Sequence, residues 1–144
     1  MKKLSVKVRR LYKDSKLPCY AHPGDAGMDL FSQKNYLIRS GQRKVLSTGV
    51  AIEIPSGYVS LIWDKSGLAT KNGLKVLGGV IDSGYRGEYI VTLHNLSKKS
   101  YQVKKGDKIA QLLIQPVSHC KIIETKNLSQ SIRGEKGFGS SGKR

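Results

Sequence analysis

The acidic side chains are the residues of this sequence most informative about chemistry, because only 10 Asp and Glu stand beside 26 Lys and Arg. Several of them, such as Asp25, Glu88 and Asp107, adjoin a glycine, and Asp beside Gly is ordinary turn chemistry. Asp82 differs because it ends the apolar pair Val80-Ile81. An aromatic ring and a cation follow it at Tyr85 and Arg86, so we expect a polar pocket here. A carboxylate in such a pocket can act as a general base or bind a metal ion, and Asp29 is a second candidate for either role.

A second candidate site lies where Asp64-Lys65-Ser66-Gly67 precede a short helical stretch at 68–72. Free N–H groups at the start of a helix favour an oxyanion, and a cation, a hydroxyl and a glycine would complete a phosphate site. An N-cap by Asp64 or Ser66 explains the same residues without any ligand. These residues alone support the two interpretations equally.

The C-terminal residues have almost nothing to bury, and we expect a mobile arm that becomes ordered only when something binds it. The segment 137–142 matches GxGxxG, but only two residues follow, too few for the helix of a dinucleotide-binding fold. Its glycine amides and the hydroxyls of Ser140 and Ser141 suit a triphosphate, as does the nearby Arg133 guanidinium. Phe138 could stack on a base. Composition alone favours a disordered polar tail without a ligand.

Apolar and polar residues alternate in several short runs separated by turn residues, which predicts β-strands with one face toward a core. The apolar members of these runs are Leu4, Val6 and Val8; Val50, Ile52 and Ile54; Val59, Leu61 and Trp63; Ile90, Val91 and Leu93; and Ala110, Leu112 and Ile114. Many short strands in 144 residues predict one all-β domain, either a barrel or a sandwich. Only residues 68–72 are expected to form a helical turn or two.

Composition argues against several classes of protein. No stretch approaches the roughly 18 apolar residues of a membrane helix. Lys7, Arg9 and Arg10 interrupt any secretion signal, so a membrane or secreted protein is not expected. The widely separated Cys19 and Cys120 are expected to be free thiols in a reducing cytoplasm.

The formal net charge of +16 predicts attraction to polyanions, whether nucleic acid, an anionic membrane or a phosphorylated small molecule. Charge alone does not choose among these ligands. The residues by themselves therefore leave two comparable hypotheses, a basic nucleic-acid-binding β-barrel and a nucleotide enzyme with a phosphate site.

Five segments, taken in order, resemble the motifs of the trimeric dUTP diphosphatase (dUTPase) family. They are Pro23–Leu30 (PGDAGMDL), Lys65–Ala69 (KSGLA), Gly79–Glu88 (GVIDSGYRGE), Gly106–Leu112 (GDKIAQL) and Arg133–Gly142 (RGEKGFGSSG). Any one of these matches would be weak. Five ordered matches cover nearly the whole chain and are highly specific.

The resemblance implies a distorted jelly-roll or β-barrel of the dUTPase-like β-clip type. It also implies a homotrimer whose active sites are built between subunits. A β domain is expected over 1–132, with a glycine-rich arm over 133–144 that closes over the active site. The implied reaction is the magnesium-assisted hydrolysis of dUTP to dUMP and pyrophosphate by attack of water on the α-phosphorus. That reaction limits uracil in DNA and supplies dUMP for thymidylate synthesis.

The resemblance also implies roles for individual residues. Asp82 matches the carboxylate that deprotonates the attacking water, and Tyr85 matches the ring beneath the deoxyribose. Asp29 matches an acidic residue that contacts Mg2+ through water. The positions that match substrate contacts are Lys65, Ser66, Gly67, Gly79, Val80, Ile81, Tyr85, Gln111, Arg133, Phe138, Gly139, Ser140 and Ser141. Backbone groups around Gly79 would read the uracil edge, and Phe138 would cover the base.

Some positions depart from the family pattern. Lys65 stands where Arg is usual, and a lysine keeps the charge but loses the planar two-pronged contact. Gly84 occupies a position that is often acidic.

Two alternatives to a dUTPase remain: a dCTP deaminase or bifunctional deaminase-diphosphatase of the same superfamily, and a basic nucleic-acid-binding barrel. Even for a dUTPase, the net charge predicts weak attraction to nucleic acid.

Overall fold

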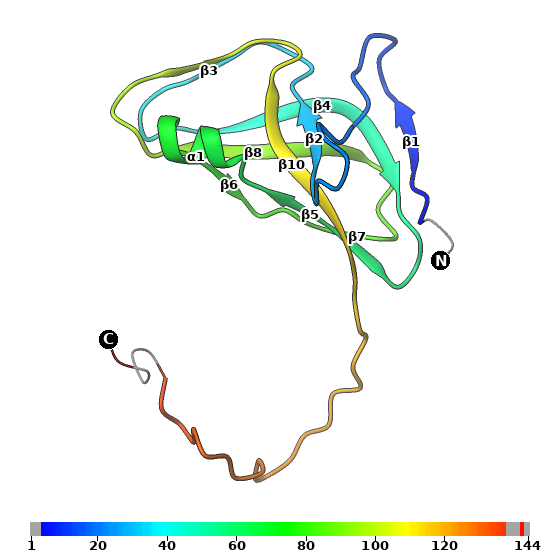
Figure 1. Ribbon diagram of the computed structural model, residues 1–144, viewed down its shortest axis with the longest axis vertical. Coiled ribbons are helices and arrows are strands. Elements are labelled where there is room, and N and C mark those ends of the chain that lie inside the picture. The colour runs from blue at the N-terminus through cyan, green and yellow to red at the C-terminus, as the bar shows by residue number, and fades with distance from the viewer. Residues whose placement is uncertain (1–3, 138–141, 143–144) are drawn as a thin grey trace.

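The computed structural model describes residues 4–137 and residue 142. Its strands are β1 Lys7–Arg10, β2 Met28–Phe31, β3 Tyr36–Ile38, β4 Arg43–Glu53, β5 Tyr58–Trp63, β6 Leu74–Leu77, β7 Val80–Asp82, β8 Glu88–Asn95, β9 Tyr101–Val103 and β10 Lys108–Pro116. The helix α1 spans Ser66–Asn72. Two four-stranded antiparallel sheets, β1-β4-β8-β6 and β2-β10-β5-β7, share one apolar core, and β3 pairs with β9 (Figure 1). The predictions of an all-β fold and of one short helical segment are confirmed.

The central strand β8 shows the alternation that the sequence predicted. Tyr89, Val91 and Leu93 are buried in the core, whereas Ile90 is about half exposed on the opposite face. A strand with one buried face buries every second side chain. β8 therefore fixes which of its residues line the core and which are available to a pocket.

The long strand β4 is bent by a β-bulge at Gly49. Its pairing with β8 shifts register between Ser47 and Ala51. Gly49 has a φ of +72°, and a Cβ there would lie 2.3 Å from Ser15 Oγ. Both the left-handed backbone and the close approach require glycine.

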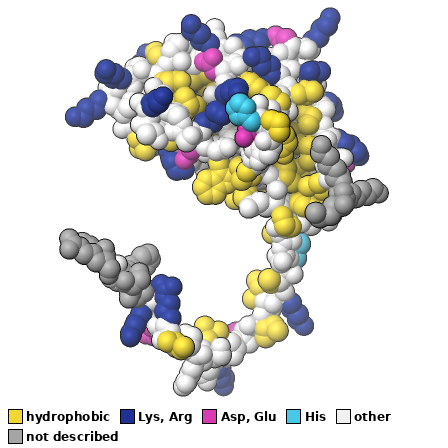
Figure 2. Space-filling model, in the orientation of Figure 1, with side chains coloured by type: hydrophobic (Ala, Val, Ile, Leu, Met, Phe, Trp, Pro, Cys, Tyr) yellow, Lys and Arg dark blue, Asp and Glu magenta, His cyan; other side chains and the backbone are white. Residues whose placement is uncertain are grey.

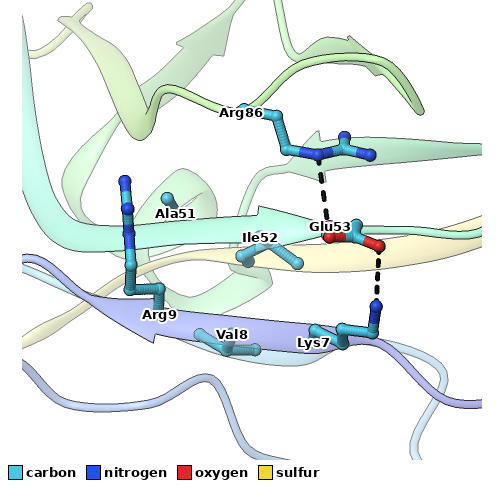
Figure 3. Close-up of a pocket in the computed structure, with 7 residues that line it drawn as sticks. All are labelled: Lys7, Val8, Arg9, Ala51, Ile52, Glu53 and Arg86. Carbon is cyan, nitrogen blue, oxygen red and sulfur yellow. Dashed lines mark hydrogen bonds and ion pairs between the residues drawn. The ribbon is translucent and has the colours of Figure 1, made fainter.

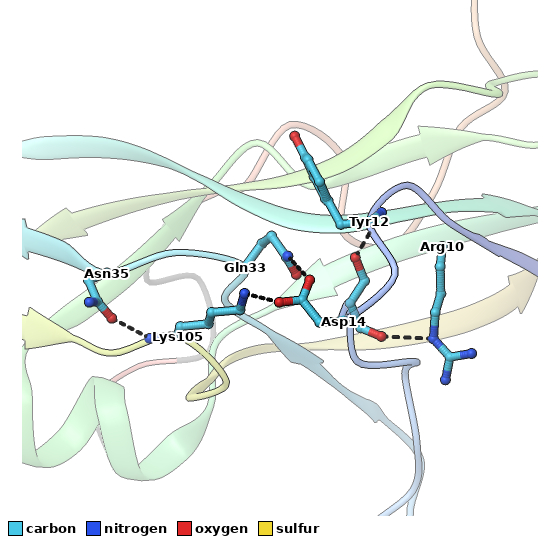
Figure 4. Close-up of polar contacts among 7 residues, drawn as sticks. Arg10, Tyr12, Asp14, Gln33, Asn35 and Lys105 are labelled. Atoms are coloured by element: carbon cyan, nitrogen blue, oxygen red, sulfur yellow. Dashed lines mark hydrogen bonds and ion pairs between the residues drawn. The ribbon is translucent and has the colours of Figure 1, made fainter.

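Polar contacts fasten the N-terminal segment beside this bulge (Figure 4). Gln33 Nε2 donates to Asp14 Oδ1 at 2.9 Å, and Lys105 Nζ forms an ion pair with the same carboxylate. Arg10 Nε donates to the Ser15 carbonyl at 2.8 Å. These contacts join segments that are distant in sequence and hold Ser15 against Gly49.

The strand β5 turns its alternating apolar residues outward, so the prediction that Val59, Leu61 and Trp63 face the core is wrong. Ser60 and Ile62 are buried instead, and Trp63 is 53% exposed. The outward face continues onto neighbouring strands, because Leu61 lies opposite Leu113 of β10 and Val80 of β7. We call Val59, Leu61, Trp63, Val80 and Leu113 the outer apolar face. In Figure 2, hydrophobic side chains gather on the part of the body nearest the tail.

The chain leaves the body after β10 ends at Pro116 (Figure 1). Residues 117–137 are exposed and form neither strand nor helix, and Ile122, Leu128 and Ile132 have almost no contact with the body. Residues 117–132 were predicted to belong to the β domain, and the boundary at 133 stays a prediction about function. Within the described residues, no helix is both long and apolar enough to cross a membrane.

Candidate active site

A pocket of about 370 Å³ lies beside the tight connection between β6 and β7, which belong to different sheets. We call this connection the hairpin and the cavity the hairpin pocket, although the two strands do not pair with each other. Its walls are Ile62, Leu77, Gly78, Gly79, Val80, Ile81, Asp82, Tyr85, Glu88, Ile90 and Thr92. Gly79 has a φ of +105°, and a Cβ there would lie 2.5 Å from the Ile62 carbonyl oxygen. Glycine therefore lets the hairpin approach β5, and Ile62 N donates to the Gly79 carbonyl at 2.8 Å.

Asp82 and Tyr85 both line this hairpin pocket, but its other walls are mostly apolar residues and glycines, and Arg86 is not among them. Asp82 is the exposed last residue of β7, and its carbonyl accepts a hydrogen bond from Tyr85 N at 3.1 Å. The Tyr85 hydroxyl donates to the Glu88 carbonyl at 3.1 Å. Its ring covers Gly87, where a Cβ would lie 2.4 Å from that hydroxyl. A fixed aromatic ring thus stands three residues after an accessible carboxylate.

Glu88 supports the pocket wall, a role that the sequence did not indicate. Its Oε1 accepts hydrogen bonds from Gly49 N at 2.8 Å and from Ser47 Oγ. These contacts tie the start of β8 to the bulge of β4. The partners lie about 40 positions away in the sequence, so motif spacing could not reveal them.

Arg86 turns away from the hairpin pocket. Its Nη1 donates to the carbonyls of Ser83 at 2.6 Å and Tyr85 at 2.9 Å. Its guanidinium also faces Glu53 at 3.7 Å, in a separate hollow beside β1 and β4 (Figure 3). Arg86 therefore braces the loop after Asp82 and leaves the acid without a cationic partner on that side.

A second group of predicted site residues surrounds Asp29. Asp29 is only 3% exposed and forms ion pairs with Lys65 Nζ and, at 2.6 Å, with Lys108 Nζ. Burial alone would raise the pKa of Asp29, but the hydrogen bonds from Lys108 and Lys65 outweigh it and hold that pKa below 3.8. The same contact with Asp29 raises the pKa of Lys108. Lys108 was not among the predicted site residues.

Gln111 and the start of α1 complete this second group. Gln111 lies opposite Asp29 of β2 and Trp63 of β5, and its Nε2 donates to the Asp64 carbonyl at 2.8 Å. Ser66 and Gly67 are exposed in the first turn of α1. We call Asp29, Lys65, Ser66, Gly67, Lys108 and Gln111 the phosphate-side cluster.

The helix cap differs from both residues considered from the sequence. The N-cap residue is Lys65, and no side chain caps the helix. Asp64 faces β6 instead, where its Oδ1 accepts from Val76 N at 2.5 Å and its Oδ2 pairs with Lys75 Nζ at 2.6 Å. The capping interpretation was therefore wrong, and the Ser66 hydroxyl is not used as a cap.

The hairpin pocket and the phosphate-side cluster lie apart in one chain. Asp82 is opposite Val59 and Gln111 is opposite Trp63, and these β5 residues are separated by about 13 Å at 3.3 Å per residue. Arg133 is exposed in the tail, where its Nε donates to the Lys136 carbonyl at 2.9 Å. Phe138, Gly139, Ser140 and Ser141 lie outside the described residues. Among the residues that the structure describes, one chain does not bring the predicted site residues together.

The residues near Asp29 suit a hydrated metal ion better than a directly bound one. Within the described chain, no group of three or more His, Cys, Asp or Glu side chains could hold a metal by itself. A single buried carboxylate paired with two lysines can offer one contact through water. This donor set fits magnesium that arrives with a triphosphate, because Mg2+ keeps several waters and commonly needs only one or two carboxylates.

Known proteins resemble this chain over nearly its full length. The dUTPase family model matches residues 13–142. The deoxyuridine 5'-triphosphate nucleotidohydrolase of Clostridium tetani is 48% identical over 99% of this chain and 100% of its own, and that of Thermobifida fusca is 46% identical over 95% and 78%.

Solved structures agree with these sequence matches. A mutant dUTPase of Staphylococcus bacteriophage 80alpha with dUpNHpp has a TM-score of 0.90 and 32% identity, over 96% of this chain and 98% of its own. A mutant dUTPase of phage phi11 of S. aureus, described with a structural Mg(II) ion, has a TM-score of 0.82 and 28% identity, over 88% and 99%. The chain belongs to the dUTPase family.

Proposed function

We propose that this dUTPase hydrolyses dUTP to dUMP and pyrophosphate by attack of a water on the α-phosphorus, with Asp82 as the general base. The observation that carries this assignment is the exposed Asp82 carboxylate at the rim of the hairpin pocket, next to the fixed Tyr85 ring. A carboxylate within hydrogen-bond reach of a water can orient it and take its proton. Arg86 is engaged with carbonyls, so it does not mask Asp82.

The hairpin pocket fits a pyrimidine deoxynucleoside. The turn at Gly78 and Gly79, together with Val80 and Ile81, would present backbone donors and acceptors to the uracil edge. The flat Tyr85 ring would lie against the sugar and leave no room for a 2′-hydroxyl. Its hydroxyl is held by the Glu88 carbonyl, so the ring is fixed before substrate arrives.

The phosphate-side cluster fits a triphosphate. Lys65 would supply charge, while Ser66, Gly67 and Gln111 would donate hydrogen bonds to phosphate oxygens. Asp29 would hold the water shell of magnesium, and the bound ion would neutralise charge on the phosphates. A triphosphate would compete with Asp29 for Lys65, whose side chain is 29% exposed and therefore within reach of a ligand.

A homotrimer would bring the separated parts into one site. The hairpin pocket would come from one subunit and the phosphate-side cluster from a second. The arm of a third would supply Arg133, Phe138, Gly139, Ser140 and Ser141. The outer apolar face supports this assembly, because large exposed apolar patches usually mark contacts with another chain. Closure of the arm would exclude bulk water and align the phosphate chain.

Pyrophosphate release tests the proposed reaction. We expect release from dUTP, little from UTP, dCTP or dTTP, and a strong dependence on magnesium. Asp82→Asn should lower turnover by about 100- to 10,000-fold while dUTP binding persists, because the shape is kept and the base is lost. Full activity of Asp82→Asn would remove Asp82 from this role, and ammonia release from dCTP would instead favour the deaminase alternative.

The reaction would limit uracil in DNA and supply dUMP for thymidylate synthesis. We place it in the cytoplasm, supported by the free cysteines Cys19 and Cys120 and by the bacterial relatives. Most of the 26 cations lie outside both parts of the site, so the proposed reaction does not explain the net charge of +16.

A further inference from the structure

We propose that the loops at one end of the molecule bind the phosphate backbone of nucleic acid. This basic end comprises residues 39–44, 71–73 and 94–101, near α1 and the ribbon of β3 and β9 (Figure 1). It shares no residue with the hairpin pocket, whose wall on β8 reaches Thr92, whereas the basic end begins at His94. The proposal therefore concerns a surface that adjoins the candidate active site but is built from other residues.

The basic end contains six cations and no acidic residue. The cations are Arg39, Arg43, Lys44, Lys71, Lys98 and Lys99. No ion pair in residues 4–137 involves any of the six, and five of them are exposed while Lys44 is partly buried. Some cations elsewhere, such as Lys75 and Lys105, are paired with carboxylates, and others, such as Lys13, are not; the basic end is distinguished by having no acidic residue at all. The six positive charges of the basic end are therefore not neutralised by carboxylates of the described chain.

A fully buried asparagine holds two of these loops in place. Asn95 is 0% exposed, and its Nδ2 donates to the Ile38 carbonyl at 2.9 Å and to the Lys99 carbonyl at 2.8 Å. Its Oδ1 accepts from Ser97 N at 2.9 Å and from Ser97 Oγ at 2.8 Å. Such a satisfied buried amide rigidifies the backbone around it.

Backbone hydrogen bonds connect the loops at 39–44 and 71–73 to the segment around Asn95. Gly41 N donates to the Asn95 carbonyl at 2.8 Å, which fixes the loop that carries Arg39 and Arg43. Leu96 N donates to the Gly73 carbonyl at 2.8 Å, which fixes the end of α1. The cations therefore stand on a prearranged scaffold, so less backbone entropy is lost when a polyanion binds.

A hollow of about 420 Å³ opens between the loops of the basic end. It is lined by Lys71, Asn72, Ser97, Lys98, Lys99, Ser100 and Tyr101. The three ammonium groups and the neighbouring hydroxyls can donate hydrogen bonds to a phosphate. No carboxylate lines the hollow, so nothing there repels a phosphate. We therefore expect a backbone phosphate to bind in this hollow, with the other cations of the basic end contacting neighbouring phosphates.

The spread of charge favours nucleic acid over a single phosphate group or a membrane. Six cations on three loops exceed what one phosphate can contact, whereas a duplex presents a charge about every 1.7 Å along its axis. A lipid surface would be expected to bind an apolar group beside the cations. Among the described residues of the basic end, Leu96 is the one large hydrophobic side chain that is exposed. A single exposed leucine offers a membrane little apolar surface, so the basic end suits nucleic acid better than a lipid surface.

Two variants with equal net charge test the proposal. Lys71→Gln/Lys98→Gln/Lys99→Gln changes the basic end, and the control Arg9→Gln/Lys13→Gln/Lys104→Gln changes exposed cations elsewhere. Each lowers the formal net charge from +16 by three, to +13. Binding of the full-length proteins to a fluorescent DNA duplex of about 30 base pairs is measured by anisotropy across salt concentrations, beside hydrolysis of dUTP.

We expect the basic-end variant to bind DNA at least about tenfold more weakly at low salt. Its plot of log affinity against log salt should be less steep by about three, one for each lost phosphate contact. The control should bind nearly as the unmodified protein does, and both variants should keep their hydrolytic activity. Equal weakening of both variants, undetectable DNA binding by the unmodified protein, or tighter binding to phosphatidylserine vesicles than to DNA would overturn the proposal. None of these outcomes depends on whether dUTP is the substrate.

Discussion

At the scale of single residues, Asp29 shows how a predicted metal contact can also hold structure. Its carboxylate joins Lys65, at the start of α1, to Lys108, at the start of β10. Three segments distant in sequence thereby meet at one buried charge. Removing one member of a buried ion pair is costly because the remaining charges stay unpaired, although the partly exposed lysines here keep some water.

Asp29→Asn is expected to lower the free energy of unfolding by about 1–3 kcal/mol at neutral pH. The folded-state pKa of Asp29 lies below 3.8, so its charge contributes stability above the unfolded-state pKa. That contribution is lost as pH falls through the folded-state pKa. Urea unfolding at about pH 7 and about pH 3, at one protein concentration, should show the difference shrinking at the lower pH.

Glu53→Gln provides a matched control for this experiment. Glu53 also has a lowered pKa, caused first by its hydrogen bond with Lys7, but the pair is exposed. Exposed ion pairs contribute little to stability, so we expect almost no change at either pH. If Asp29→Asn were equally harmless, the buried carboxylate would have no structural role.

At the scale of elements, local sequence patterns predict where strands lie, but they do not predict which face of a strand packs against the core. The alternation in β8 matches its buried Val91 and Leu93, but in β5 the buried residues are Ser60 and Ile62. The alternation of Val59, Leu61 and Trp63 is a periodic signal, but in this strand it marks the outer face and not the core. The choice depends on what the rest of the molecule packs against it.

The same limit applies to the candidate site. Asp82 and Tyr85 were predictable because acid and ring lie within one short segment. Glu88 and Lys108 were not, because their importance comes from Gly49 and Asp29, which long-range strand pairing brings beside them. Motif spacing records neighbours along the chain and cannot record neighbours across a sheet.

The connection between β6 and β7 depends on Gly79, and Gly79→Ala should damage the pocket. The new Cβ would lie 2.5 Å from the Ile62 carbonyl oxygen in a left-handed backbone, so the hairpin must move away from β5. A misplacement near 1 Å can cost about 100-fold, so kcat/KM for dUTP should fall by about 10- to 100-fold. Steady-state kinetics with dUTP measure this loss.

Gly57→Ala separates backbone strain from displacement of the hairpin. Gly57 has a φ of +82°, and a Cβ there would meet no atom within 4 Å. We expect this variant to lose about 1 kcal/mol of stability and to keep its activity. If both variants lost the same activity, backbone strain alone would account for the effect of Gly79→Ala.

At the scale of the whole molecule, the separation of the two parts of the site limits how one chain alone could bind and hydrolyse dUTP. About 13 Å of β5 lies between the residues opposite Asp82 and Gln111. A triphosphate bound across one chain would have to span this distance over the outer apolar face, where Leu61 and Leu113 offer no hydrogen bonds. In the proposed homotrimer, sharing the site between subunits would bury that face and bring acid and phosphate contacts together, because symmetric assembly places different surfaces opposite one another.

Mixed assemblies test this sharing directly. Asp82→Asn removes the base, and Ser66→Asp places a negative charge at the exposed start of the phosphate-side cluster, so each variant alone should be inactive. In mixed trimers formed by coexpression in equal amounts, a site with its pocket and its cluster on different subunits has both parts intact in about a quarter of cases. We therefore expect about a quarter of the unmodified activity in the coexpressed protein. Mixing the two purified variants without subunit exchange should give none. A coexpressed protein as inactive as its components would place the pocket and the cluster of each site on the same chain.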